Sequence, residues 1–166
     1  LSAWREARRL RLAREEALAL EYLSETYILE GSLPQARAAT RLCRRLADRI
    51  APEGDIALEI GVREAMLLLA EGQPREAAAK ARATIRQAQR AEMKWELAQA
   101  HRVLGMAYAR LGQRPSALTA LTTARELLAT MGEKLELPVV EAWLGTLAPR
   151  LGPERARTRT ETGRDG

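Results

Sequence analysis

The chain has 166 residues, a formal net charge of +5 and 46% hydrophobic residues, which is enough apolar material for one domain with a buried core. Phe and Asn are absent, aromatic residues are only 4%, and the single cysteine excludes an internal disulfide. No apolar run is long enough to cross a membrane and no signal peptide is present, so we expect an all-α cytoplasmic protein without a membrane partner.

The first segment, residues 1–13, contains Trp4 among several arginines. Shifted by 81 positions, it aligns with residues 85–90, which close a later predicted helix. We therefore expect it to be the remnant of an upstream helix pair, and the chain to be a fragment of a longer protein. Trp4 is then interpreted as a core side chain at a cut edge rather than as a binding site.

Residues 14–54 are predicted to form the first complete helix pair, with helices over 14–30 and up to about 50. Gly31 and Pro34 mark the turn between them. Cys43 lies on the apolar face of the second helix, which indicates a small buried hydrophobe rather than a reactive thiol. The predicted inward positions are Leu20, Leu23, Ser24, Tyr27, Ala36, Ala39, Cys43, Leu46 and Ala47.

The second pair is predicted over residues 55–93, with Asp55 as the N-cap of its first helix. That helix is apolar almost all round, which indicates that neighbours cover it on several sides. Gly72 and Pro74 mark the turn. The link over residues 90–95 holds no glycine or proline, so the next boundary is not fixed by the sequence.

The third pair, residues 94–133, shows the clearest pattern. Its first helix carries apolar or small residues at steps of three and four, and Gly112 and Pro115 mark the turn to the second helix. The small residues Gly105, Ala117 and Ala120 predict a close approach of the two backbones.

The last predicted helix lies within residues 134–152, with Pro138 in its first turn and Val140, Leu144, Leu147 and Leu151 facing inward. It has no partner helix, so it is interpreted as a cap for the array. Residues 153–166 contain no large apolar side chain, which predicts a disordered tail.

These units repeat at a fixed distance. Gly112 follows Gly72 by 40 residues and Gly72 follows Gly31 by 41. The run of Leu104, Gly105, Tyr108, Gly112, Ala117 and Ala124 resembles the signature of the tetratricopeptide repeat (TPR) family, although the unit here is longer than the usual ~34 residues. Such long units resemble those of large bacterial regulators. The resemblance implies that residues 1–152 form a right-handed α-solenoid of stacked antiparallel helix pairs.

No catalytic pattern is found. His101 is the only histidine, and its position predicts a core or groove side chain rather than a catalytic base. One cysteine and one histidine do not make a zinc site, and the glycines separate helices instead of forming a phosphate loop. We therefore expect no enzyme activity, no cofactor and no metal.

The resemblance implies a concave groove along the first helix of each pair, where the family binds peptides. The groove positions form an apolar strip centred on two methionines, with acidic residues at one end and arginines at the other. The candidate partner-binding residues are Glu25, Ile28, Glu59, Val62, Met66, Leu69, Gln99, Arg102, Met106, Arg110 and Arg150. The strip is equally compatible with contact to a neighbouring domain or to another copy of the chain.

The expected function is a protein–protein interaction scaffold that binds a peptide or partner domain, as part of a bacterial signalling or transcription regulator. The alternative is a helical repeat that binds nucleic acid through its arginines. Interleaved acidic residues and the wide spacing of Trp4, Trp95 and Trp143 disfavour nucleic acid, because single strands need aromatic side chains to stack on.

Overall fold

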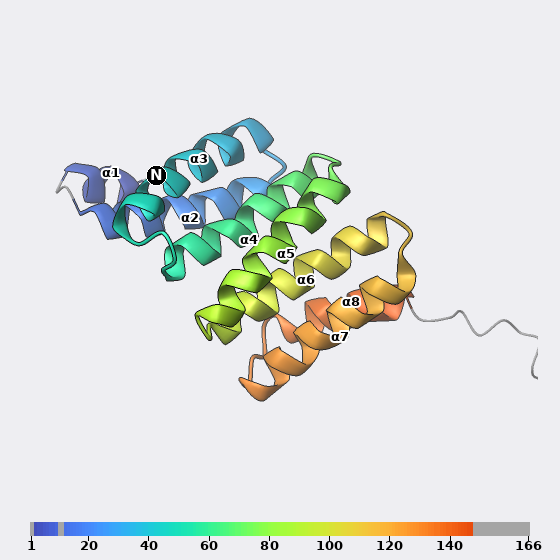
Figure 1. Cartoon of the computed structure of the whole chain (residues 1–166). Coiled ribbons are helices and arrows are strands. Elements are labelled where there is room, and N and C mark those ends of the chain that lie inside the picture. Colours follow the sequence, from blue (N-terminus) through green and yellow to red (C-terminus); the bar gives the residue numbers. More distant parts are fainter. Residues whose placement is uncertain (1, 10–11, 148–166) are drawn as a thin grey trace, which may run out of the picture.

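The computed structural model describes residues 2–9 and 12–147. Within these ranges the chain is all-helical and contains no strand (Figure 1). The helices are α1 (Ser2–Arg9), α2 (Ala13–Leu29), α3 (Leu33–Ile50), α4 (Asp55–Ala70), α5 (Pro74–Arg90), α6 (Lys94–Arg110), α7 (Arg114–Thr130) and α8 (Leu137–Leu147). The all-α prediction is confirmed, and helix bounds agree with the sequence prediction to within a few residues; the predicted tail and Leu151 lie outside the described residues.

The turns within the helix pairs share one geometry. Gly31, Gly72 and Gly112 have φ of 74°, 76° and 72°, a left-handed conformation that glycine adopts without steric cost. After each glycine, the next backbone N–H donates to a carbonyl of the preceding helix, as in Gln113 N–H to Tyr108 O at 2.9 Å. The predicted equivalence of these three turns is confirmed.

The link between α5 and α6 uses the same turn without a glycine. Glu92 takes the left-handed conformation with φ of 55°, and the N–H of Met93 donates to Ala88 O at 3.0 Å. The predicted N-cap at Asp55 is wrong, because Gly54 occupies the cap position and Asp55 is the first helical residue. The Asp55 carboxylate instead accepts hydrogen bonds from Arg14 and from the N–H of Ile56.

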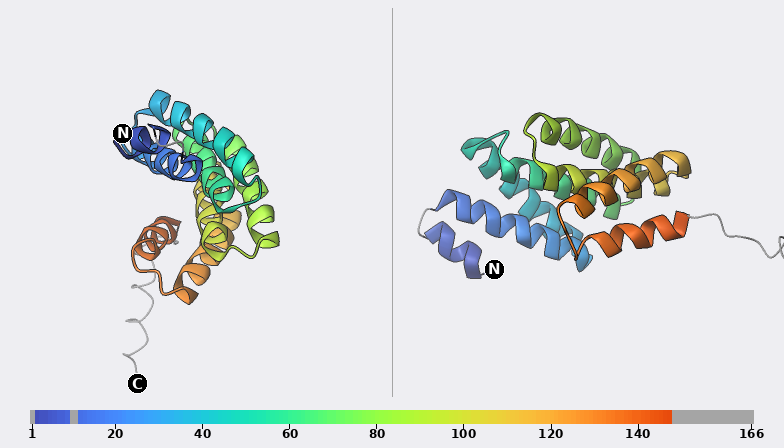
Figure 2. Two further views of the ribbon diagram at one scale, coloured as in Figure 1. Left: turned by 90° about the vertical axis from the view of Figure 1, so that its left-hand side faces the viewer. Right: turned by 90° about the horizontal axis from the view of Figure 1, so that it is seen from below.

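The helices form two rows. Helices α2, α4, α6 and α8, here called the inner row, contact one another in sequence, whereas no contact joins α3 to α5 or α5 to α7, here called the outer row. Each helix also packs on its neighbour in the chain, and α1 packs on α2. Because one row is in contact and the other is spread, the helices follow an arc with the inner row on its concave side (Figure 2).

The predicted close approach within the third pair is confirmed. A Cβ added to Gly105 of α6 would lie 2.5 Å from Leu121 Cγ and 3.2 Å from the carbonyl oxygen of Ala117, both on α7. Gly61 of α4 is similarly close to the Thr84 hydroxyl of α5, at 2.8 Å. Glycine is therefore needed at these two positions for the helix pairs to pack at this distance.

Three clusters of buried apolar residues form the core, one between each set of neighbouring pairs. Cys43 is fully buried in the first of them, its thiol donating to Ala17 O, and burial raises its pKa to about 12. This confirms the interpretation of Cys43 as a small buried hydrophobe. Trp4 is half-buried, and its indole N–H donates to Glu16. None of the helices described is both long and apolar enough to cross a membrane.

Candidate functional site

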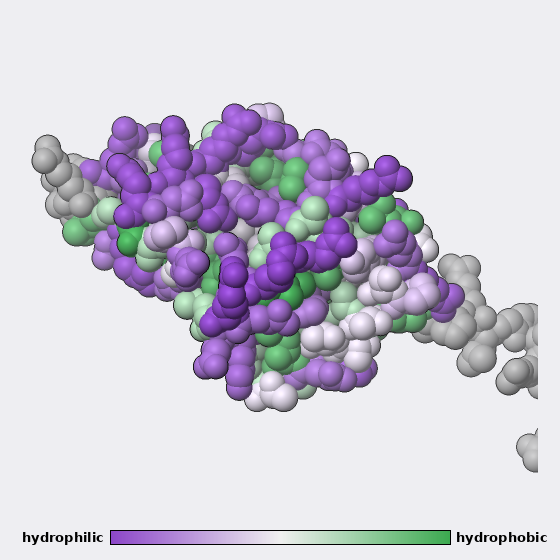
Figure 3. Space-filling model, in the orientation of Figure 1, coloured by the Kyte–Doolittle hydropathy of each residue, from purple (hydrophilic) through white to green (hydrophobic). Residues whose placement is uncertain are grey.

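Charged and polar side chains are buried along the inner row, which is unusual because such groups lose their hydration there. Glu21 on α2 is 3% exposed, and Glu96, Gln99 and Arg102 on α6 are 9%, 4% and 8% exposed. The face with α5 and α7 in front is different: hydrophilic side chains cover most of it and hydrophobic ones show only as small separate patches (Figure 3). The buried polar groups of the inner row therefore set this face apart as the candidate functional site.

Arg63 of α4 connects the first two pairs. Its Nε donates to Glu21 Oε1 at 2.6 Å and its Nη2 donates to Glu25 Oε2 at 3.0 Å, both on α2. Burial raises the pKa of Glu21, and the Arg63 guanidinium opposes that effect. Since Arg63 is only 14% exposed, this guanidinium is committed to two carboxylates in a largely dehydrated place.

Glu59 lies one helical turn before Arg63 on α4 and is half-buried. Burial is the main cause that raises its pKa to about 7, and the carboxylates of Glu21, Glu96 and Asp55 raise it further, while Arg63 opposes them. Near neutral pH this carboxyl group is therefore divided between its charged and uncharged forms.

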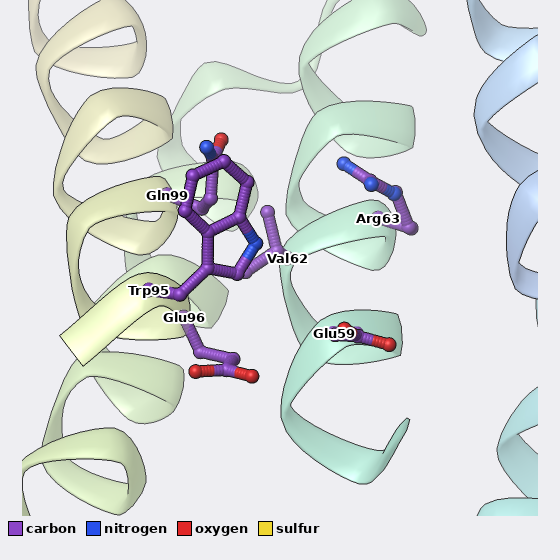
Figure 4. A pocket seen from close by; sticks show the side chains of 6 residues that line it. All are labelled: Glu59, Val62, Arg63, Trp95, Glu96 and Gln99. Atoms are coloured by element: carbon purple, nitrogen blue, oxygen red, sulfur yellow. The ribbon is translucent and has the colours of Figure 1, made fainter. Parts of the chain in front are cut away.

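A recess lies between α4 and α6, lined by Glu59, Val62, Arg63, Trp95, Glu96 and Gln99, which we call the α4–α6 recess. The Trp95 indole stands between the two helices with Val62 facing it, and the carboxylates of Glu59 and Glu96 lie at one end (Figure 4). The recess holds about 190 Å³ of empty space, including its open side.

The amide of Gln99 is the least satisfied group in this recess. Neither its oxygen nor its nitrogen has a hydrogen-bond partner, although the side chain is almost completely buried. An unmade hydrogen bond of this kind costs about 1–3 kcal/mol, so a molecule that supplies a partner regains that energy.

A second polar group lies between α6 and the segment before α8. Arg102 Nη1 is 3.2 Å from Glu136 Oε2, while burial lowers the Arg102 pKa and leaves its Nε without a partner. His101 beside it in sequence is half-buried, its Nδ1 has no partner and burial lowers its pKa. The placement of His101 agrees with the prediction of a core or groove side chain.

The structure places the predicted groove residues differently from the expected apolar strip. Val62, Leu69, Gln99 and Arg102 are buried, and Met66 and Met106 pack against the core between the second and third pairs. Glu25, Ile28 and Glu59 are half-buried, Arg110 is exposed, and Arg150 lies outside the described residues. The methionines therefore contribute to the core, and the distinctive groups of this face are charged or polar.

Sequence reasoning missed Arg63, Trp95 and Glu96. A signal existed for Arg63, because it follows Glu21 by 42 residues and Glu25 by 38, about one repeat length. Residues one repeat apart lie side by side on neighbouring inner helices. No comparable signal marked Trp95 and Glu96, since no glycine or proline fixes the start of α6.

Among the residues that the structure describes, no group of three His, Cys, Asp or Glu side chains is placed to hold a metal ion. Comparisons of the chain with models of protein families, with curated proteins and with solved structures found no significant match. The inner row and its unpartnered polar groups are therefore the basis on which a function is proposed.

Proposed function

We propose that this chain is a protein–protein interaction module that binds a peptide segment of a partner along the inner row. The observation that carries the proposal is the buried Gln99 amide without a hydrogen-bond partner in the α4–α6 recess. Natural proteins rarely leave such groups unsatisfied, and the missing partner is readily supplied by a ligand. The concave shape of the inner row adds a surface along which an extended or helical segment can lie.

We further propose that the array is a right-handed α-solenoid of the TPR type and part of a larger cytoplasmic bacterial regulator. Supporting it are the equivalent turns at Gly31, Gly72 and Gly112 and the contact of each helix pair with its neighbours in sequence. The regulator context follows only from the likeness of the long repeat unit, which is an analogy at the level of fold.

Nucleic-acid binding receives less support from the geometry. Arg14, Arg37, Arg44, Arg63 and Arg102 each lie within 4 Å of a carboxylate, which neutralises the charge that phosphates would need. The remaining exposed arginines alternate with acidic residues along the helices.

Selection from a random peptide-display library on the purified chain tests the proposal. We expect peptides that bind in the micromolar range, about −8 kcal/mol. On addition of a selected peptide, amide NMR signals of α4 and α6 are expected to shift more than those of α3, α5 and α7. Failure to select any peptide, or shifts confined to the outer row, would rule out the proposed binding face.

A single substitution sharpens that test. Gln99→Leu keeps the volume of the side chain but removes its donor and acceptor, so we expect weaker binding of the selected peptides without loss of fold. Gln87→Leu is the matched control, because Gln87 is exposed on α5 of the outer row. Equal affinities for the two variants would contradict the role given to Gln99.

A further inference from the structure

The α4–α6 recess brings together two carboxylates that have no cationic partner. Within the described part of the chain, neither Glu59 nor Glu96 is in an ion pair, although Glu96 is only 9% exposed. The nearby cations are already used: Arg63 is held by Glu21 and Glu25, and Arg14 is held by Asp55. The recess is therefore negatively charged and lacks the cation that would balance it.

The unpartnered amide is an independent observation in the same place. Gln99 is 4% exposed, lines the recess and has a free acceptor oxygen. Its amide lies beside the Trp95 indole (Figure 4). Two carboxylates and an amide oxygen together offer hydrogen-bond acceptors, which match the three donors of an ammonium group.

The size of the recess distinguishes between the possible cations. Its enclosed part has room for about one water-sized group, which suits a compact ammonium better than a planar guanidinium. The indole of Trp95 and the side chain of Val62 supply an apolar wall for the methylene chain behind the charge, and an aromatic ring also attracts a cation over its face.

We infer that the α4–α6 recess is the anchor site for a lysine side chain of the bound peptide, with its ammonium at Glu59, Glu96 and Gln99 and its methylene chain along Trp95. This inference rests on the proposed function, because it identifies the chemistry of the peptide that the inner row binds. It also predicts a basic partner segment, which complements the uncompensated acidic groups of the recess.

The probe for the site is Nα-acetyl-lysine N-methylamide, with the norleucine analogue as the uncharged control of nearly equal shape. The indole N–H signal of Trp95, assigned by its loss in Trp95→Phe, reports binding by NMR. We expect saturable binding of the lysine probe in the millimolar range, about −4 kcal/mol, and at least roughly tenfold weaker binding of the norleucine analogue. Equal responses to the two probes would overturn the inference.

Variants test which groups hold the ammonium. Glu59→Gln and Glu96→Gln each remove one negative charge with little change of shape, and each is expected to weaken lysine binding about tenfold. Glu126→Gln is the matched control, since Glu126 is exposed on α7 of the outer row. Unchanged binding by both recess variants, or an equal loss in the control, would contradict the assignment.

Binding should also depend on pH through Glu59. The charged groups around this carboxyl group are Arg14 and Glu21 on α2, Asp55 and Arg63 on α4, and Glu96 on α6, while the Cys43 thiol on α3 stays uncharged. The lysine probe remains protonated between pH 6 and 8, whereas Glu59 loses its proton near pH 7. Affinity is therefore expected to rise across this range in the wild type and to rise less in Glu59→Gln; an identical profile in both would contradict the role of Glu59.

The selected peptides separate this inference from the proposed function. If they bind the inner row and their affinity falls at least about tenfold when one lysine is replaced by norleucine, both proposals are supported. If they bind the inner row but tolerate every such replacement, the lysine site is wrong and the interaction module stands. Equal or tighter binding of the arginine analogue of the probe overturns the choice of lysine.

Discussion

At the scale of single residues, two glycines inside helices have opposite surroundings. Gly105 faces Leu121 and Ala117 so closely that a Cβ has no room, whereas a Cβ on Gly145 of α8 would meet no atom within 4 Å. The same substitution therefore tests packing at one site and helix propensity at the other.

We expect Gly105→Ala to lower the free energy of unfolding by about 1–3 kcal/mol, because Leu121 and the backbone of α7 must move to admit the methyl group. Gly145→Ala is expected to raise it by roughly 0.5–1 kcal/mol, because alanine loses less conformational entropy in a helix. Urea unfolding followed by circular dichroism measures both. A stabilising effect at Gly105 would show that the α6–α7 spacing is not set by this contact.

The candidate site was predictable at this scale only in part. The repeat length places Glu59 and Gln99 at the same position of successive inner helices, so their membership of one face follows from the sequence. Their burial does not follow, because it depends on how the Trp95 indole fills the space between α4 and α6. Helical periodicity gives the direction of a side chain but not how deeply its neighbours cover it.

At the scale of helices and turns, the chain makes the same left-handed turn with two different residues. Glycine occupies it after α2, α4 and α6, and Glu92 occupies it after α5. The glycine turns could be predicted because a glycine followed by proline is a strong helix boundary. The Glu92 turn could not, since nothing in its local sequence marks the conformation.

We expect Glu92→Gly to raise the free energy of unfolding by about 0.5–1 kcal/mol, because it removes the steric cost of a Cβ at φ of 55°. Thermal or urea unfolding measures the gain. Gly112→Ala is the reciprocal control: its Cβ would touch nothing within 4 Å, so any loss of stability comes from the backbone conformation. If Glu92→Gly destabilises the protein instead, the glutamate side chain contributes more than the backbone cost.

At the scale of the whole molecule, stability is distributed along a row of units that touch only near neighbours. Such an array opens in parts, since contacts between distant units do not bind the whole together. The order of helices and the pairing of each with the next were predictable from the repeat. The ion pairs that join one unit to another were not, because a salt bridge depends on the rotation between neighbouring inner helices.

Arg63 tests this organisation. Arg63→Ala leaves the carboxylate of Glu21 buried without its partner, so we expect a loss of about 3 kcal/mol at neutral pH. The loss is expected to shrink in acid, because the pKa of Glu21 is raised by burial and its protonated form needs no cation. Amide hydrogen exchange is expected to accelerate in α2 and α3 more than in α6 and α7.

The double variant Arg63→Ala with Glu21→Gln provides the control. It removes both members of the pair, so part of the lost stability should return. Uniform acceleration of exchange over all helices would mean that the array unfolds as one cooperative unit, contrary to the distribution described above.

The missing contacts between α3, α5 and α7 have a mechanical consequence. Bending the arc changes the width of the gaps on its outer side and breaks no helix contact there, while the inner helices act as a chain of hinges. The molecule is in this sense a leaf spring with its stiff side toward the ligand. A segment that grips two inner helices at once would fix the curvature of the whole array, so occupancy at one place could be felt at both ends.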